Sequence, residues 1–301
     1  MIASLRERWD AFWFEPEHAL QLAVIRVLAA GTALWVLISR DRAGVSGLGA
    51  EFWSGVSTIT RWRFLLFPGH ESLERSLTLL AAVLLVATLL GIRPRLTAFA
   101  SALLLYHLAP LESIVWTPAP YGRGLTIPTL ALLLCGVAPS GDALALGARS
   151  TAPSWRYGWP VRLLQLWLVS VYFFSGIAKL RASGFAWASG ENLTHWLRLA
   201  TQNELVNVHV SLGRWIADRP LAASAAGVLT LAFELGCVVA LFSRRVRPWF
   251  ALVAIGFHFG IYLAMNITFN SWPLLLAFVD WHAAVERWRA WRARQRVPSP
   301  A

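Results

Sequence analysis

Charged residues are scarce in this sequence, and their scarcity excludes most classes of soluble protein. Only 14% of the 301 residues are charged, whereas 57% are hydrophobic. An average soluble domain has about 25% charged residues, and a soluble protein of this size cannot hide so much apolar surface. A disordered chain is excluded for the same reason. The composition predicts an all-α fold, a polytopic integral membrane helical bundle in a lipid bilayer.

Lysine, cysteine and acidic residues are also rare. The chain has 27 Lys and Arg residues against 16 Asp and Glu, which gives a formal net charge of +11, and Lys179 is its only lysine. In a membrane protein this excess serves topology and contact with anionic lipid, so we expect no nucleic-acid partner. Cys135 and Cys237 both lie in apolar runs, which indicates neither a disulfide framework nor a metal site.

Familiar motifs of soluble enzymes are missing as well. No HExxH, GxSxG, Walker or Rossmann pattern occurs, and the seven histidines show no metal-ligand spacing. No cleavable signal peptide is evident before the first long apolar run, near Leu20. Residues 1–17 are charged and rich in aromatics, which predicts an interfacial helix that leads into the first span.

Long apolar runs, by contrast, are abundant. A helix needs about 20 mostly apolar residues to span a bilayer. The runs predict about eight transmembrane helices in a single membrane domain over residues 1–301, and the fourth and eighth are short enough to be re-entrant. The expected spans are 20–39, 73–91, 96–115, 125–139, 161–180, 221–242, 248–266 and 271–286.

The placement of arginine predicts the orientation of these spans. The loops 91–95 and 243–247 and the tail 286–301 are short and basic, so we expect them on the cytoplasmic side. The chain is then a multi-pass protein of the cell membrane with both termini in the cytoplasm. The long loops 40–72 and 181–220 fall outside.

An ionisable residue within a membrane span needs a partner or a task, and five residues are candidates for such a role. Arg26 and Glu234 carry opposite charges and could satisfy one another between helices, His107 could bond a backbone carbonyl, and His258 could bond a neighbouring helix. The five are Arg26, His107, Lys179, Glu234 and His258.

Lys179 has two interpretations. Near the end of the fifth span, it could extend its amine to the lipid headgroups. Alternatively, burial disfavours a charged amine, and a neutral lysine is a general base. The small residues Ser175, Gly176 and Ala178 would let another helix or a flat ligand approach closely. A turn-like segment, 184–190, and an amphipathic stretch, 191–200, follow and suit the membrane plane.

Four blocks of sequence together resemble a known family. They are the fifth-span signature LLQLWLVSVYFFSGIAKL, the first-span block Ala23-Val24-Ile25-Arg26, the block Phe233-Glu234-Leu235 before a basic SRRVRP loop, and His258-Phe259-Gly260-Ile261. In order and spacing they are similar to the HTTM (horizontally transferred transmembrane) domain family over about residues 9–285. Members of that family resemble the membrane domain of vitamin K-dependent γ-glutamyl carboxylase.

This resemblance implies a lyase-type carboxylation that uses a reduced quinone of the vitamin K or menaquinol type, with O2 and CO2 as co-substrates. Epoxidation of the quinone would be coupled to carboxylation of a peptide glutamate. Lys179 matches the position of the lysine base. His258 matches a histidine position of the family motif, where it would orient the quinol or an oxyanion. Residues that could line the substrate or quinol pocket are Arg26, His107, Tyr172 and Glu234.

Two departures leave the activity open. Arg123 stands where family members often carry a histidine, and we expect no large extracytoplasmic substrate-binding domain in these residues. The chain could work with a secreted peptide or a separate substrate-binding subunit. It could also be a non-catalytic membrane partner for peptide maturation, export or immunity. A transporter is less favoured, because no paired broken helices occur in matching halves.

Overall fold

The structure, a computed structural model, describes residues 2–39, 71–115, 124–148, 152–202 and 211–295. These ranges are mostly helical and contain no β-strand, and an isolated bridge joins Glu17 to Ser154. Among the helices so described, five are long and apolar enough to cross a membrane. The predicted class, an all-α membrane bundle, is therefore confirmed. The expected number of about eight spans is not.

The chain divides into two compact units, and each is described by itself. The first comprises Met1–Val161 together with Asp280–Ala301, and the second comprises Arg162–Val279.

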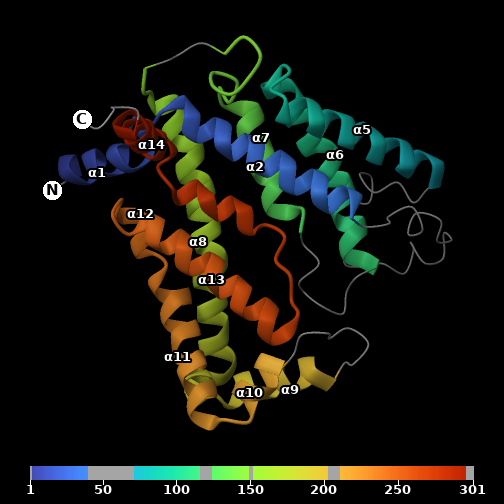
Figure 1. The fold of residues 1–301 in the computed structure, drawn as a ribbon, viewed down its shortest axis with the longest axis vertical. Helices are drawn as coiled ribbons and strands as arrows, with labels where there is room; N and C mark the ends of the chain where they lie inside the picture. The colour runs from blue at the N-terminus through green and yellow to red at the C-terminus, as the bar shows by residue number, and fades with distance from the viewer. Residues whose placement is uncertain (1, 40–70, 116–123, 149–151, 203–210, 296–301) are drawn as a thin grey trace, which may run out of the picture. The chain divides into compact units, whose positions relative to one another are not determined.

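The first unit is built around four helices, α2, α5, α6 and α7, which correspond to the first four predicted spans (Figure 1). Helix α6 packs between α5 and α7, and α2 contacts both α5 and α7. Small buried residues of α2, among them Ala23, Ala30 and Ala33, allow close packing. The helices of this unit are α1 (Ile2–Phe14), α2 (Ala19–Ile38), α5 (Glu71–Leu89), α6 (Pro94–Val115), α7 (Thr126–Val137) and α14 (Trp281–Gln295).

The second unit contains the fifth, sixth and seventh predicted spans. Helix α8 (Trp155–Ser183) enters it at Arg162, and a 3-10 turn, η2 (Gly184–Trp187), follows the helix. Gly184 and Gly190 both have positive φ, as the predicted turn-like segment requires. The remaining helices are α9 (Glu191–Gln202), α10 (Ser211–Ala217), α11 (Pro220–Gly236), α12 (Val239–Phe242), α13 (Arg247–Met265) and the 3-10 helix η3 (Trp272–Phe278).

Helix α9 corresponds to the amphipathic stretch predicted at 191–200. It buries Leu197 in a small core with Ala217 of α10 and Ala264 of α13. Trp196 and Leu199 remain exposed. One apolar side of the helix therefore packs on protein, and these two side chains face away from that core.

The eighth predicted span, 271–286, is not a continuous helix. The 3-10 helix η3 ends at Phe278, Val279 is extended, and α14 begins at Trp281. At about 2.0 Å per residue, the seven residues of η3 rise about 14 Å, which is half of a bilayer core. The break falls at Asp280, whose Oδ1 accepts a hydrogen bond from the backbone N–H of Ala283 and so starts the new helix.

Candidate functional site

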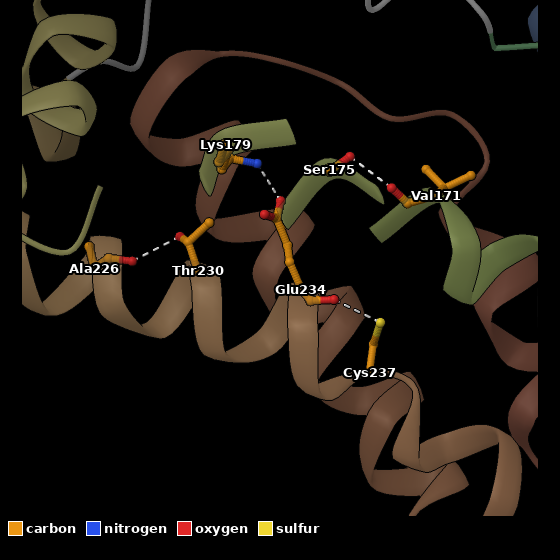
Figure 2. A network of polar contacts seen from close by, with 7 residues as sticks. All are labelled: Val171, Ser175, Lys179, Ala226, Thr230, Glu234 and Cys237. Atoms are coloured by element: carbon orange, nitrogen blue, oxygen red, sulfur yellow. Dashed lines mark hydrogen bonds and ion pairs between the residues drawn. The ribbon is translucent and has the colours of Figure 1, made fainter. Parts of the chain in front are cut away.

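The lysine singled out by the sequence forms a largely buried ion pair in the second unit. Lys179 Nζ on α8 donates a hydrogen bond to Glu234 Oε1 on α11 at 2.5 Å (Figure 2). The Lys179 side chain is 21% exposed and that of Glu234 only 5%. The second carboxylate oxygen, Oε2, is buried and has no hydrogen-bond partner. The Lys179 amine therefore has a protein carboxylate as its partner.

Gly176 brings the two helices close enough for this pair. A Cβ placed on Gly176 would lie 3.1 Å from Glu234 Cβ and 3.0 Å from Leu235 Cδ2, tighter than ordinary packing. Residue 176 precedes Lys179 by about one helical turn, so both face α11. The close approach predicted from the small residues before Lys179 is thus found between α8 and α11.

Gly176→Leu is expected to destabilise the protein by about 1–3 kcal/mol, because the added side chain must push α11 away from α8. Gly256→Leu is a matched control, since a Cβ there meets nothing within 4 Å. Thermal unfolding in nanodiscs measures both variants. Equal midpoints for the two would contradict the close helix contact.

The segment after α8 is fixed against α11 and brings an aromatic ring near Lys179. Ser224 Oγ donates a hydrogen bond to the Ala188 carbonyl at 2.6 Å. Gly227 lies directly against the carbonyl of Trp187, where a Cβ would be only 1.8 Å from the oxygen. Lys179 Nζ lies 5.2 Å from the centre of the Trp187 ring, a cation–π distance. The amine is therefore held by a carboxylate and an indole.

A second polar pair lies on α8. The Tyr172 hydroxyl and His258 Nε2 on α13 are hydrogen-bonded at 2.5 Å, while His258 Nδ1 is buried without a partner. Aromatic rings surround the pair: Phe233 lies 5.1 Å from Tyr172, and Phe269 lies 4.5 Å from His258, between ring centres. The expected bond from His258 to a neighbouring helix is therefore present, and its partner is a phenol.

The two pairs occupy one face of α8. Tyr172 and Lys179 are seven residues apart, close to two full turns, so their Cα atoms are separated by about 10 Å along the helix. Phe233 and Glu234 are consecutive on α11 and contact Tyr172 and Lys179 respectively. The second unit thus brings together four of the predicted site residues, namely Tyr172, Lys179, Glu234 and His258.

Arg26 and His107 belong to the first unit, and the predicted pairing of Arg26 with Glu234 is wrong. Arg26 is fully buried and donates to the carbonyls of Ser140, Ala143 and Leu144, which follow α7, rather than to Glu234. A guanidinium has several donors in a fixed fork, so it satisfies several carbonyls together. His107 Nε2 on α6 donates to Glu74 Oε1 on α5 at 2.8 Å, a carboxylate partner that was not predicted.

Glu74 and Trp187 are contacts that sequence reasoning missed. Glu74 stands near the start of a predicted span, where charged residues are common, so the sequence did not indicate that it is the partner of His107.

The departure from the family pattern at Arg123 lies outside the described residues. Within the described ranges, no three His, Cys, Asp or Glu side chains are grouped so that they could hold a metal ion.

The chain matches one known protein family over most of its length. The family model described as the HTTM domain matches residues 14–282. Searches of curated proteins and of solved structures gave no match. The match includes both polar pairs of the second unit and the buried arginine of the first, and it extends over most of the chain. Together with its apolar helices, this match establishes that the chain is a membrane protein and belongs to the HTTM domain family.

Proposed function

We propose that this protein is a quinol-dependent membrane enzyme, carboxylase-like in its chemistry, with Lys179 as the general base. The observation that carries the proposal is the pairing of the only lysine with a buried carboxylate. The pair lies on the same helix face as a second, aromatic-lined polar pair. Such sheltered titratable groups are typical of sites that move protons.

The Lys179–Glu234 pair can hold one proton in two ways. In apolar surroundings, separate charges are costly, and a neutral amine beside a carboxylic acid avoids that cost. With the proton on Glu234, the Lys179 nitrogen presents a lone pair and accepts a proton from a substrate hydroxyl. The ammonium that results remains beside Trp187 and the Glu234 side chain.

The neighbouring residues fit a hydroxylated aromatic ring. His258 Nδ1 and Glu234 Oε2 are buried polar atoms without partners, and Phe233 and Tyr172 offer apolar faces near them. His258 and Tyr172 would hold and orient such a ring, and Lys179 would take its proton. A reduced quinone of the vitamin K or menaquinol type would supply the reducing power that O2 consumes, and CO2 would add to the deprotonated glutamate of the peptide.

The test uses the full chain in nanodiscs with reduced vitamin K or menaquinol, O2, labelled bicarbonate and a glutamate-rich peptide. We expect quinone epoxide and peptide-bound label from the wild type and neither from Lys179→Arg, because a guanidinium stays protonated. Arg181→Lys, an exposed change two residues along the helix, should retain activity. A wild-type protein that forms neither product with either quinol would overturn the proposal.

The second candidate is a non-catalytic membrane partner for the maturation, export or immunity of a secreted peptide. One observation favours it: Lys179 and Glu234 already satisfy each other as an ion pair between α8 and α11. On this alternative, Lys179→Arg would keep the cellular phenotype, since arginine can also pair with Glu234.

The proposal also includes the orientation of the chain, with both termini on the cytoplasmic side of the membrane. In the first unit, the backbone N–H of Trp281, the first residue of α14, donates to Gln21 Oε1, near the start of α2. This contact supports the placement of both termini on one side of the membrane, and the basic loops favour the cytoplasmic side. Accessibility of cysteines introduced at Arg6 and Arg294 to a membrane-impermeant reagent tests this orientation.

A further inference from the structure

Helix α14 is the most unusual surface of the first unit, because among the described residues it is attached only at its beginning. Residues 281–285 are half-buried, whereas every residue from Glu286 to Gln295 is exposed. A helix of this length that buries no residue gains little from packing on its own protein. Within the part of the chain that the structure describes, residues 286–295 therefore present an open surface.

The first turn of α14 lies beside the start of a candidate membrane span. The backbone N–H of Trp281 donates to Gln21 Oε1 at 3.2 Å, and the His282 ring stacks on His18 with 3.5 Å between ring centres. His18 directly precedes the candidate span α2. Burial, followed by the proximity of His282, lowers the pKa of His18, and Asp280 opposes this effect.

The exposed part of α14 combines arginine with tryptophan. It has four arginines against one glutamate, Glu286, which pairs with Arg289 at 2.9 Å. Trp288 and Trp291 are 51% and 54% exposed. The guanidinium of Arg292 lies 4.4 Å from the centre of the Trp288 ring, so the cation and the indole share one side of the helix. The arginines are Arg287, Arg289, Arg292 and Arg294.

We propose that α14 lies on the bilayer surface and binds the phosphate groups of anionic phospholipids through its arginines, with Trp288 and Trp291 at headgroup level. Tryptophan is enriched at that level, and each basic residue near an anionic leaflet adds attraction. A bilayer is favoured over a soluble polyanion because the first turn of α14 is joined to the end of a membrane span. This proposal does not depend on the enzymatic one.

The test follows the environment of α14 in the full chain. An environment-sensitive dye on Ala290→Cys reports the exposed part, since Cys135 and Cys237 are both buried. The protein is placed in nanodiscs of phosphatidylcholine alone or mixed with phosphatidylglycerol. We expect the emission to shift to shorter wavelength only in the anionic nanodiscs, and 1 M salt, where the Debye length is about 3 Å, should remove most of the shift.

Two quadruple variants separate charge from fold. Changing the four arginines to glutamine should abolish the shift, whereas changing them to lysine should retain most of it. The proposal is overturned if the glutamine variant still shifts, if both lipid mixtures give the same emission, or if added RNA shifts the emission where anionic lipid does not. Each outcome is independent of any carboxylase assay.

Discussion

Arg26→Leu is expected to lower the free energy of unfolding by about 3–5 kcal/mol, because several buried carbonyls lose their hydrogen-bond donor together. The guanidinium is fully buried in the first unit and serves three backbone carbonyls after α7. Without it, these carbonyls lose their donors, and a buried acceptor left unsatisfied costs about 1–3 kcal/mol. Thermal unfolding of the purified protein in nanodiscs measures the loss.

Arg95→Leu provides a matched control for this change. Arg95 also donates to carbonyls at the end of α7, those of Gly136 and Val137, but it is exposed. Water can replace an exposed donor, so we expect a loss of about 0.5–1.5 kcal/mol. Arg26→Lys should fall between the two, because an ammonium keeps the charge but lacks the planar fork. If Arg26→Leu were no worse than Arg95→Leu, the carbonyl contacts would not hold the unit together.

Lys179→Met is expected to destabilise the protein by about 3 kcal/mol, since it leaves a buried carboxylate without its partner. Glu234→Leu should cost about half as much, because Lys179 is the more exposed partner and keeps its contact with Trp187. The double variant should recover to within about 1 kcal/mol of the wild type, as apolar side chains replace a buried ion pair. Unfolding of all four proteins gives the coupling energy.

This cycle also separates the two candidate functions. A folded Lys179→Met/Glu234→Leu protein should form no quinone epoxide if the lysine is the base. If the double variant keeps the cellular phenotype of the wild type, the pair is architectural and the enzymatic proposal is wrong. Losses in the single variants that simply add in the double variant would contradict the ion pair itself.

The sequence predicted the class of the fold because apolar runs of span length leave little choice in a bilayer. It also marked Lys179, Glu234 and His258, since ionisable residues in such runs are rare. The sequence could not show which of these residues pair with each other. Lys179 and Glu234 are 55 residues apart, and by charge alone Arg26 was an equally good partner for Glu234. Charge complementarity alone does not specify which helices are neighbours.

The end of the eighth apolar run, the contact of Gly176 and the packing of α9 depend on tertiary contacts that the sequence indicates only weakly. Composition predicted one continuous span over residues 271–286. The structure instead starts a new helix after Asp280, whose Oδ1 accepts a hydrogen bond from the backbone N–H of Ala283. Gly176 was noticed as a small residue, and its contact with α11 agrees with that prediction. The sequence also predicted that α9 is amphipathic, but it did not predict that its apolar side packs on α10 and α13.

The spacing of Tyr172 and Lys179 on α8 has a consequence for motion. Because both side chains leave the same side of the helix, a turn of α8 about its own axis by one residue, about 100°, would break both hydrogen bonds at once. Sliding or twisting of α8 is therefore opposed at two levels by two different neighbours, α11 and α13.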